Sequence, residues 1–280
     1  MRKLGTLLMC VFFIHFTSFE QAIRRPAASG YIGCGAYSTY ERDAFSFTSN
    51  QAALTDIKKV SGGIYGERKF LLRELSFYSA AIVLPTHSGN FGIKTVYSGF
   101  SDYYETQAGL AYGRRLGDRI NVGLQFNYFA FRVAGYGGAA AFFFEAGTLI
   151  HLTANLQAGI HLYNPVGGRL DGNTGEKLPF VYTTALGYDV SPQFSVNVEV
   201  EKEEDRPSNV NACLQYRLIP RIKAKGGIAI ATSRLWLGIG ITVRTFRIEI
   251  TASYHPQLGA TPGLLLLFDN ATETNAQNEQ

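Results

Sequence analysis

The chain has 280 residues, of which 46% are hydrophobic and only 17% are charged, and its formal net charge is +4. This small and dispersed basic excess does not indicate a protein that binds nucleic acid. The sequence contains 16 Tyr, 20 Phe and 30 Gly residues, a composition that fits a β-protein better than an ordinary soluble domain.

The first residues have the order of a secretory signal peptide. Arg2 and Lys3 precede an apolar run over residues 4–16, and small or polar residues follow as far as Ala22. We therefore predict a cleavable export signal over residues 1–22, which leaves 24 basic and 21 acidic residues. Its apolar part is too short for a transmembrane helix, and no other stretch approaches the roughly 20 apolar residues that such a helix needs.

Residues 23–57 form a segment of a different kind from the rest of the chain. Gly30, Gly33 and Gly35 come early in it, a polar stretch follows over residues 38–43, and no regular alternation is present. We expect either a periplasmic extension or a hatch that folds into the lumen of a barrel as a plug.

From about residue 58 onward, apolar and polar side chains alternate. Over residues 194–201, for example, the series from Phe194 to Val200 is apolar and the series from Ser195 to Glu201 is polar. Period two places the two series on opposite faces of a strand. One face is aliphatic and aromatic, and the other is polar or small.

Turn signals divide the alternating region into about fourteen strands. We predict that they begin near residues 58, 73, 90, 103, 118, 138, 152, 178, 192, 208, 220, 234, 246 and 261. The number is even, and tight connections such as 191–193 alternate with longer ones such as 164–178. Bacterial outer-membrane barrels share these features, so we predict an all-β, transmembrane antiparallel β-barrel over residues 58–268 with a disordered polar tail over 269–280. The alternative is a soluble β-sandwich or propeller, whose strands also alternate.

Charged side chains on the polar face are expected to point into the lumen, because an outward charge would meet hydrocarbon. They are Lys94, Asp189, Glu199, Glu201, Arg217, Lys223, Lys225, Arg247 and Glu249. These groups could pair across neighbouring strands or hydrate the lumen, or they could line a permeation path or hold the N-terminal segment. The acidic cluster over residues 199–205 could bind divalent cations or lipopolysaccharide, or form a solvated loop.

After removal of the signal two cysteines remain, Cys34 in the N-terminal segment and Cys213 on the polar face of a strand. A disulfide between them would tether the segment to the wall in an oxidising periplasm, and two free or buried thiols are the alternative. His161 also lies on the polar face, where it is expected to be a hydrogen-bonded wall residue. We find no catalytic motif and no zinc-binding cysteine spacing, so we predict no enzyme activity, cofactor or metal.

Several short motifs together resemble a known family. They are Gly33-Cys-Gly-Ala36, Asp43-Ala-Phe45, Asn50-Gln-Ala-Ala-Leu54, Asn164-Pro165 and His255-Pro-Gln-Leu-Gly259. The chain resembles the PorV/PorQ-like outer-membrane proteins of Bacteroidetes, which are related to the FadL-like long-chain fatty-acid transporters. The resemblance implies a fourteen-stranded barrel with a hatch in its lumen, and it places Gly33, Gly35, Asn50 and Ala52 in that hatch.

By the same resemblance, the expected function is passive uptake of small hydrophobic molecules through a plugged barrel in a bacterial outer membrane. The expected partners are outer-membrane lipid, lipopolysaccharide and a hydrophobic ligand. A non-transporting scaffold or partner of a type IX-like secretion machine is the alternative, and an open general porin is a third. Apolar side chains within the hatch and lumen, with Phe45, Phe47 and Trp236 as candidates, would favour uptake. Glycine-rich polar walls without a cavity would favour the scaffold.

Overall fold

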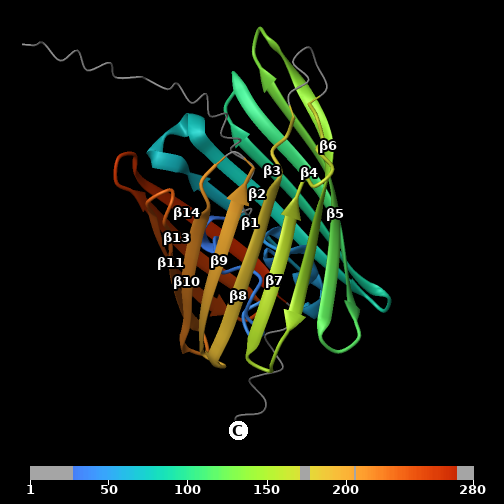
Figure 1. Cartoon of the computed structure of the whole chain (residues 1–280). Helices are drawn as coiled ribbons and strands as arrows, with labels where there is room; N and C mark the ends of the chain where they lie inside the picture. Colours follow the sequence, from blue (N-terminus) through green and yellow to red (C-terminus); the bar gives the residue numbers. More distant parts are fainter. Residues whose placement is uncertain (1–27, 171–176, 205, 270–280) are drawn as a thin grey trace, which may run out of the picture.

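The computed structural model describes residues 28–170, 177–204 and 206–269 (Figure 1). The predicted signal peptide and residues 270–280 of the predicted tail lie outside the described residues. Fourteen antiparallel strands close into a barrel, in which each strand pairs with its neighbours in sequence and β1 pairs with β14. The predicted fold class and strand number are confirmed.

All strands begin within four residues of the positions predicted from turn signals. Their bounds are β1 Ser61–Arg68, β2 Ser76–Thr86, β3 Gly89–Gly99, β4 Tyr103–Leu116, β5 Ile120–Val133, β6 Gly137–His151, β7 Leu156–Tyr163, β8 Val181–Ser191, β9 Phe194–Glu203, β10 Asn209–Ile219, β11 Ile222–Ala229, β12 Arg234–Val243, β13 Phe246–His255 and β14 Gly259–Asp269. At 14, 14 and 15 residues, strands β4 to β6 are longer than the other strands, and they rise above the rim at one end (Figure 1).

The two ends of the barrel differ in their connections. At one end, here the turn end, hairpins of two to four residues join β2 to β3, β4 to β5 and so on to β12 and β13. At the other, the loop end, residues 164–180 join β7 to β8, and the short 3₁₀ helices η4 (Lys69–Leu71) and η5 (Arg73–Leu75) join β1 to β2. Such asymmetry is typical of outer-membrane barrels, with the turn end periplasmic.

The polarity of the barrel is reversed relative to a soluble protein. Outward-facing Leu124 and Ile250 are 62% and 65% exposed, whereas inward-facing Asn127 and Asn197 are fully buried. A soluble sandwich or propeller would show the opposite distribution, because its apolar face would form the core. None of the helices within the described residues is long and apolar enough to cross a membrane.

Residues 28–57, here the luminal segment, fill the interior of the barrel (blue in Figure 1). The segment contains three short 3₁₀ helices, η1 (Ser29–Tyr31), η2 (Ser46–Thr48) and η3 (Gln51–Asp56). Ser29 donates a hydrogen bond to Glu67, near the loop end of β1, whereas Ile57 lies just before the turn end of the same strand. The segment therefore runs along the lumen from the loop end to the turn end.

Candidate functional site: the barrel lumen

Glycines on the inner face of β4 to β8 let the luminal segment approach the wall closely. They form a belt made of Gly113, Gly123, Gly147, Gly159 and Gly187. A Cβ atom at Gly123 would lie 2.6 Å from the backbone nitrogen of Ala52, and one at Gly147 would lie 2.9 Å from that of Gln51. A side chain at Gly123 or Gly147 would displace η3 from the wall, and one at Gly159 or Gly187 would displace Tyr37. The sequence-based reasoning missed this belt, although glycines recur on the inward parity of neighbouring strands.

A buried carboxylate, Glu145 on β6, is the centre of a polar network beside the belt. Its two oxygens lie 2.8 to 3.2 Å from side-chain nitrogens of five residues. Four are on the wall, Lys94, Gln125, Asn127 and His161, and the fifth is Gln51 of the luminal segment. Three neighbouring or nearby strands, β3, β5 and β7, and η3 therefore share one acceptor on β6. The sequence-based reasoning missed Glu145 because it follows Phe142, Phe143 and Phe144. In this uniform apolar run the sequence does not show which side chains face inward.

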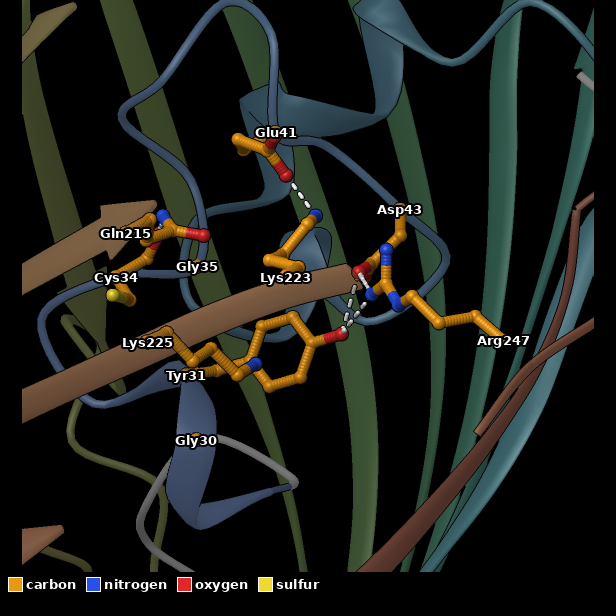
Figure 2. Close-up of a pocket in the computed structure, with 10 residues that line it drawn as sticks. All are labelled: Gly30, Tyr31, Cys34, Gly35, Glu41, Asp43, Gln215, Lys223, Lys225 and Arg247. Atoms are coloured by element: carbon orange, nitrogen blue, oxygen red, sulfur yellow. Dashed lines mark hydrogen bonds and ion pairs between the residues drawn. The ribbon is translucent and has the colours of Figure 1, made fainter. Parts of the chain in front are cut away.

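Two carboxylates of the luminal segment pair with basic side chains on β10, β11 and β13, and Figure 2 shows the pairs on β11 and β13. Glu41 accepts from Arg217 at 2.8 Å and also pairs with Lys223. Asp43 pairs with Arg247 and accepts a 2.6 Å hydrogen bond from the Tyr31 hydroxyl. The wall thus holds this part of the segment by its charges.

Arg42, between these two carboxylates, is directed toward other partners. It pairs with Asp56 at the end of η3 and donates to Gln157 on β7. On the neighbouring β8, Asp189 accepts hydrogen bonds from the Ser38 hydroxyl at 2.6 Å and the Thr39 backbone at 2.8 Å. Polar contacts therefore bind the middle of the segment to both sides of the lumen.

For Asp43 and for Arg42, burial and the nearest opposite charge shift the pKa in opposite directions. Burial alone would raise the pKa of Asp43, but Arg247 and the hydrogen bond from Tyr31 more than offset it, so the pKa lies below its ordinary value. Burial lowers the pKa of Arg42 to about 9, and the nearby Asp189 limits the shift. Both side chains are charged at neutral pH.

Cys34 and Cys213 are joined in a disulfide with their Cα atoms 5.5 Å apart. Both are buried in a small cluster with Trp236 of β12. The amide of Gln215 donates a 3.1 Å hydrogen bond to the Cys34 carbonyl beside this link. The disulfide attaches the luminal segment to β10, on the side where Glu41 is also paired.

The structure places the predicted charged residues on the inner face of the barrel. Glu199 accepts from Asn211 at 2.8 Å, and Lys225 pairs with Glu249 at 2.6 Å, while Glu201 lies half-buried near the loop end. Glu199 and Lys225 thus have partners on the wall, whereas Asp189, Arg217, Lys223 and Arg247 contact the luminal segment. In the predicted acidic cluster Glu203 pairs with Arg206 at 3.2 Å, and Asp205 lies outside the described residues. Over the described ranges, no three His, Cys, Asp or Glu side chains are grouped as metal ligands.

The residues expected in the hatch all lie in the luminal segment. Gly33 has a φ of 72°, a left-handed conformation that favours glycine, and it lies against Asn211. A Cβ at Gly35 would lie 2.5 Å from the Ser49 hydroxyl. Asn50 caps η3 by accepting from the backbone nitrogen of Ala52 at 3.1 Å.

Apolar side chains of the luminal segment pack against apolar side chains on the inner faces of β14, β1, β2 and β3, which also carry buried polar residues such as Ser79 and Lys94. The luminal segment contributes Phe45 and Phe47, which are fully buried, together with Ala44, Leu54 and Ile57. The wall contributes Tyr65, Phe77, Ala81, Val83, Val96, Leu265 and Leu267. Trp236, the third predicted lining aromatic, belongs instead to the disulfide cluster.

The charged side of the lumen is closely filled. The cavity in Figure 2 has a volume of about 10 Å³, and its lining includes Tyr31, Glu41, Asp43, Lys223, Lys225 and Arg247. This volume accommodates about one water molecule. A solute would have to displace side chains to pass here.

No protein-family model and no curated protein sequence matches the chain. Solved structures do resemble it. A FadL homologue from Pseudomonas aeruginosa aligns with a TM-score of 0.62 at 10% identity, covering 87% of this chain and 98% of the other. The monoaromatic hydrocarbon channel CymD aligns at 0.60 and 11% identity, covering 86% and 95%.

The toluene transporter TodX of Pseudomonas putida aligns at 0.58 and 10% identity, covering 87% of this chain and 96% of the other. At such low identity these likenesses carry information on the fold alone. The chain has the fold of the FadL-like barrels.

Proposed function

We propose that the protein is a bacterial outer-membrane channel for passive uptake of small hydrophobic molecules, with the luminal segment as its plug. The observation that carries this proposal is the buried apolar cluster in which Phe45 and Phe47 of the plug pack against β14 to β3. Water-filled pores have polar interiors, so a buried apolar lining favours an apolar solute. The PorV/PorQ-like assignment, an origin in Bacteroidetes and contact with lipopolysaccharide stay predictions from the sequence.

The exterior supports the proposed location. Apolar side chains cover the outward face, and Tyr97 and Tyr104 stack there with ring centroids 5.8 Å apart. An exposed apolar surface of this extent is costly in water and is stabilised in lipid.

The scaffold alternative finds support in the glycine belt and the closely filled charged side of the lumen. It does not explain why Phe45 and Phe47 face an apolar wall. A scaffold needs only a filled lumen, and polar contacts such as those of Glu41 and Gln51 would fill it. The apolar lining is therefore the feature that favours uptake.

Entry of N-phenyl-1-naphthylamine into intact cells tests the proposal, because this dye fluoresces in lipid and the lipopolysaccharide leaflet slows its entry. Cells that produce the barrel should take up the dye faster than cells without it, while hydrolysis of the polar substrate nitrocefin stays unchanged. Equal dye entry in both would refute the uptake function. In planar bilayers the intact barrel should be closed to ions, and removal of residues 28–56 should open it.

A further inference from the structure

The apolar cluster extends over the height of the barrel as a single contact network, here the apolar track. At the loop end it includes Leu170 and Leu178 of the β7–β8 connection, which join Phe129 and Phe143 on the inner wall. At the turn end it includes Ile57, just before β1. Buried apolar side chains thus connect the two mouths of the lumen, along β14 to β3 at the turn end and across to β5 and β6 at the loop end.

The luminal segment is attached very differently on its other sides. Toward β10 to β13 it is held by the disulfide of Cys34 and by the ion pairs of Glu41 and Asp43. Toward β4 to β8 its backbone lies against the glycine belt, and Gln51 donates to Glu145. Separation there would strand buried charges and polar groups without partners.

Along the track the contacts are mainly between apolar side chains. The polar exceptions include the amide of Asn90, which donates to the Ile57 carbonyl at 2.7 Å, and the contact of Ser29 with Glu67. An apolar solute that enters between such side chains replaces one van der Waals contact by another. This side can therefore open at a smaller free-energy cost than the charged side.

The cations of the lumen are already engaged. Lys94 pairs with Glu145, Lys225 with Glu249, and Arg247 with Asp43, while Arg217 and Lys223 share Glu41. A carboxylate or sulfonate on a solute would have to displace one of these acids. The side chains that form the track are aliphatic and aromatic, and buried charged groups beside them have partners: Glu67 accepts from Tyr65, and Lys94 pairs with Glu145.

From these contacts, and on the basis of the proposed function, we infer that uncharged apolar molecules cross along the apolar track. The plug stays attached to β10–β13 while Phe45, Phe47 and the side chains of β14 to β3 move apart. The inference deepens the proposed function by naming its path and by restricting its substrates to neutral molecules.

Two alanines provide a matched test. Ala81 on β2 lies in the track, whereas Ala185 on β8 lies beside Tyr37 on the opposite side of the lumen, and they are 1% and 6% exposed. Ala81→Cys and Ala185→Cys are made separately in the otherwise unchanged chain, in which Cys34 and Cys213 are paired. Each is treated in cells with N-phenylmaleimide, a neutral apolar reagent, and resistance of the barrel to unfolding in dodecyl sulfate verifies assembly.

We expect A81C to react roughly tenfold faster than A185C, and its adduct to slow N-phenyl-1-naphthylamine entry roughly tenfold. The A185C adduct, obtained by longer treatment, should leave entry within about twofold. The parent barrel should not accelerate entry of 1-anilinonaphthalene-8-sulfonate, which carries a sulfonate on a similar ring system.

Equal reaction of the two cysteines, no reaction of A81C, or an unaltered dye rate in its adduct would overturn the assigned path. Acceleration of the sulfonate would overturn the restriction to neutral molecules. A parent barrel that does not speed entry of the neutral dye would refute the proposed function itself, so the two failures are distinguishable.

Discussion

Substitution of Gly123 by alanine tests whether the plug is held against the wall. The new Cβ would lie 2.6 Å from both the backbone nitrogen of Ala52 and the carbonyl oxygen of Gln51, whereas ordinary contacts lie between 3.4 and 4 Å. Relief requires a movement of about 1 Å by η3 or β5, and overpacking of this kind costs about 1–3 kcal/mol. We therefore expect the free energy of unfolding to fall by that amount, measured by urea titration of the barrel in lipid vesicles.

Gly240 on the inner face of β12 is the matched control. A Cβ there would meet nothing closer than 3.5 Å, the distance to a carboxylate oxygen of Glu249. Gly240→Ala should be neutral or stabilise by about 0.5–1 kcal/mol, because glycine costs conformational entropy in a strand. Equal stabilities of Gly123→Ala and Gly240→Ala would refute the close approach of plug and wall.

Three further predictions follow from the lumen. Titration of the processed, denatured and unreduced protein with a thiol reagent should find no free thiol, whereas two free thiols would exclude the Cys34–Cys213 disulfide. Glu145→Ala should destabilise the barrel by about 3–5 kcal/mol because Lys94 loses its buried partner, and a loss below about 1 kcal/mol in urea titration would contradict this. Because the pKa of Asp43 is lowered in the folded protein, its contribution is complete above the unfolded value of about 3.9 and is lost as pH falls through the folded value. Stability measured between pH 5 and pH 2 should therefore fall less in Asp43→Asn than in the parent protein, and parallel profiles would contradict the pairing with Arg247.

The strands could be predicted from the sequence wherever their two faces differ. Over β9, Val198 and Glu199 belong to opposite faces, and the structure places Val198 outward and Glu199 inward. This information is local, because period two follows from the geometry of a single strand. Tight turns gave the strand limits for the same reason.

The alternation of polar and apolar residues did not identify the inward-facing residues where the lumen is itself apolar. The run from Leu264 to Leu267 is uniform, so its alternation could not show that Leu265 and Leu267 face the plug. Glu145 was hidden in the same way behind three phenylalanines. The apolar track was therefore invisible in the pattern of any one strand.

The sequence by itself determined the strand order, the outward apolar face and the inward polar one, since each depends on neighbouring residues. Only the tertiary structure decided which inward groups meet. Glu41 reaches Arg217 and Lys223, and Cys34 reaches Cys213 across 179 residues, because closure of the barrel brings distant strands around one segment. The division of the lumen into a charged side and an apolar side arises from that closure.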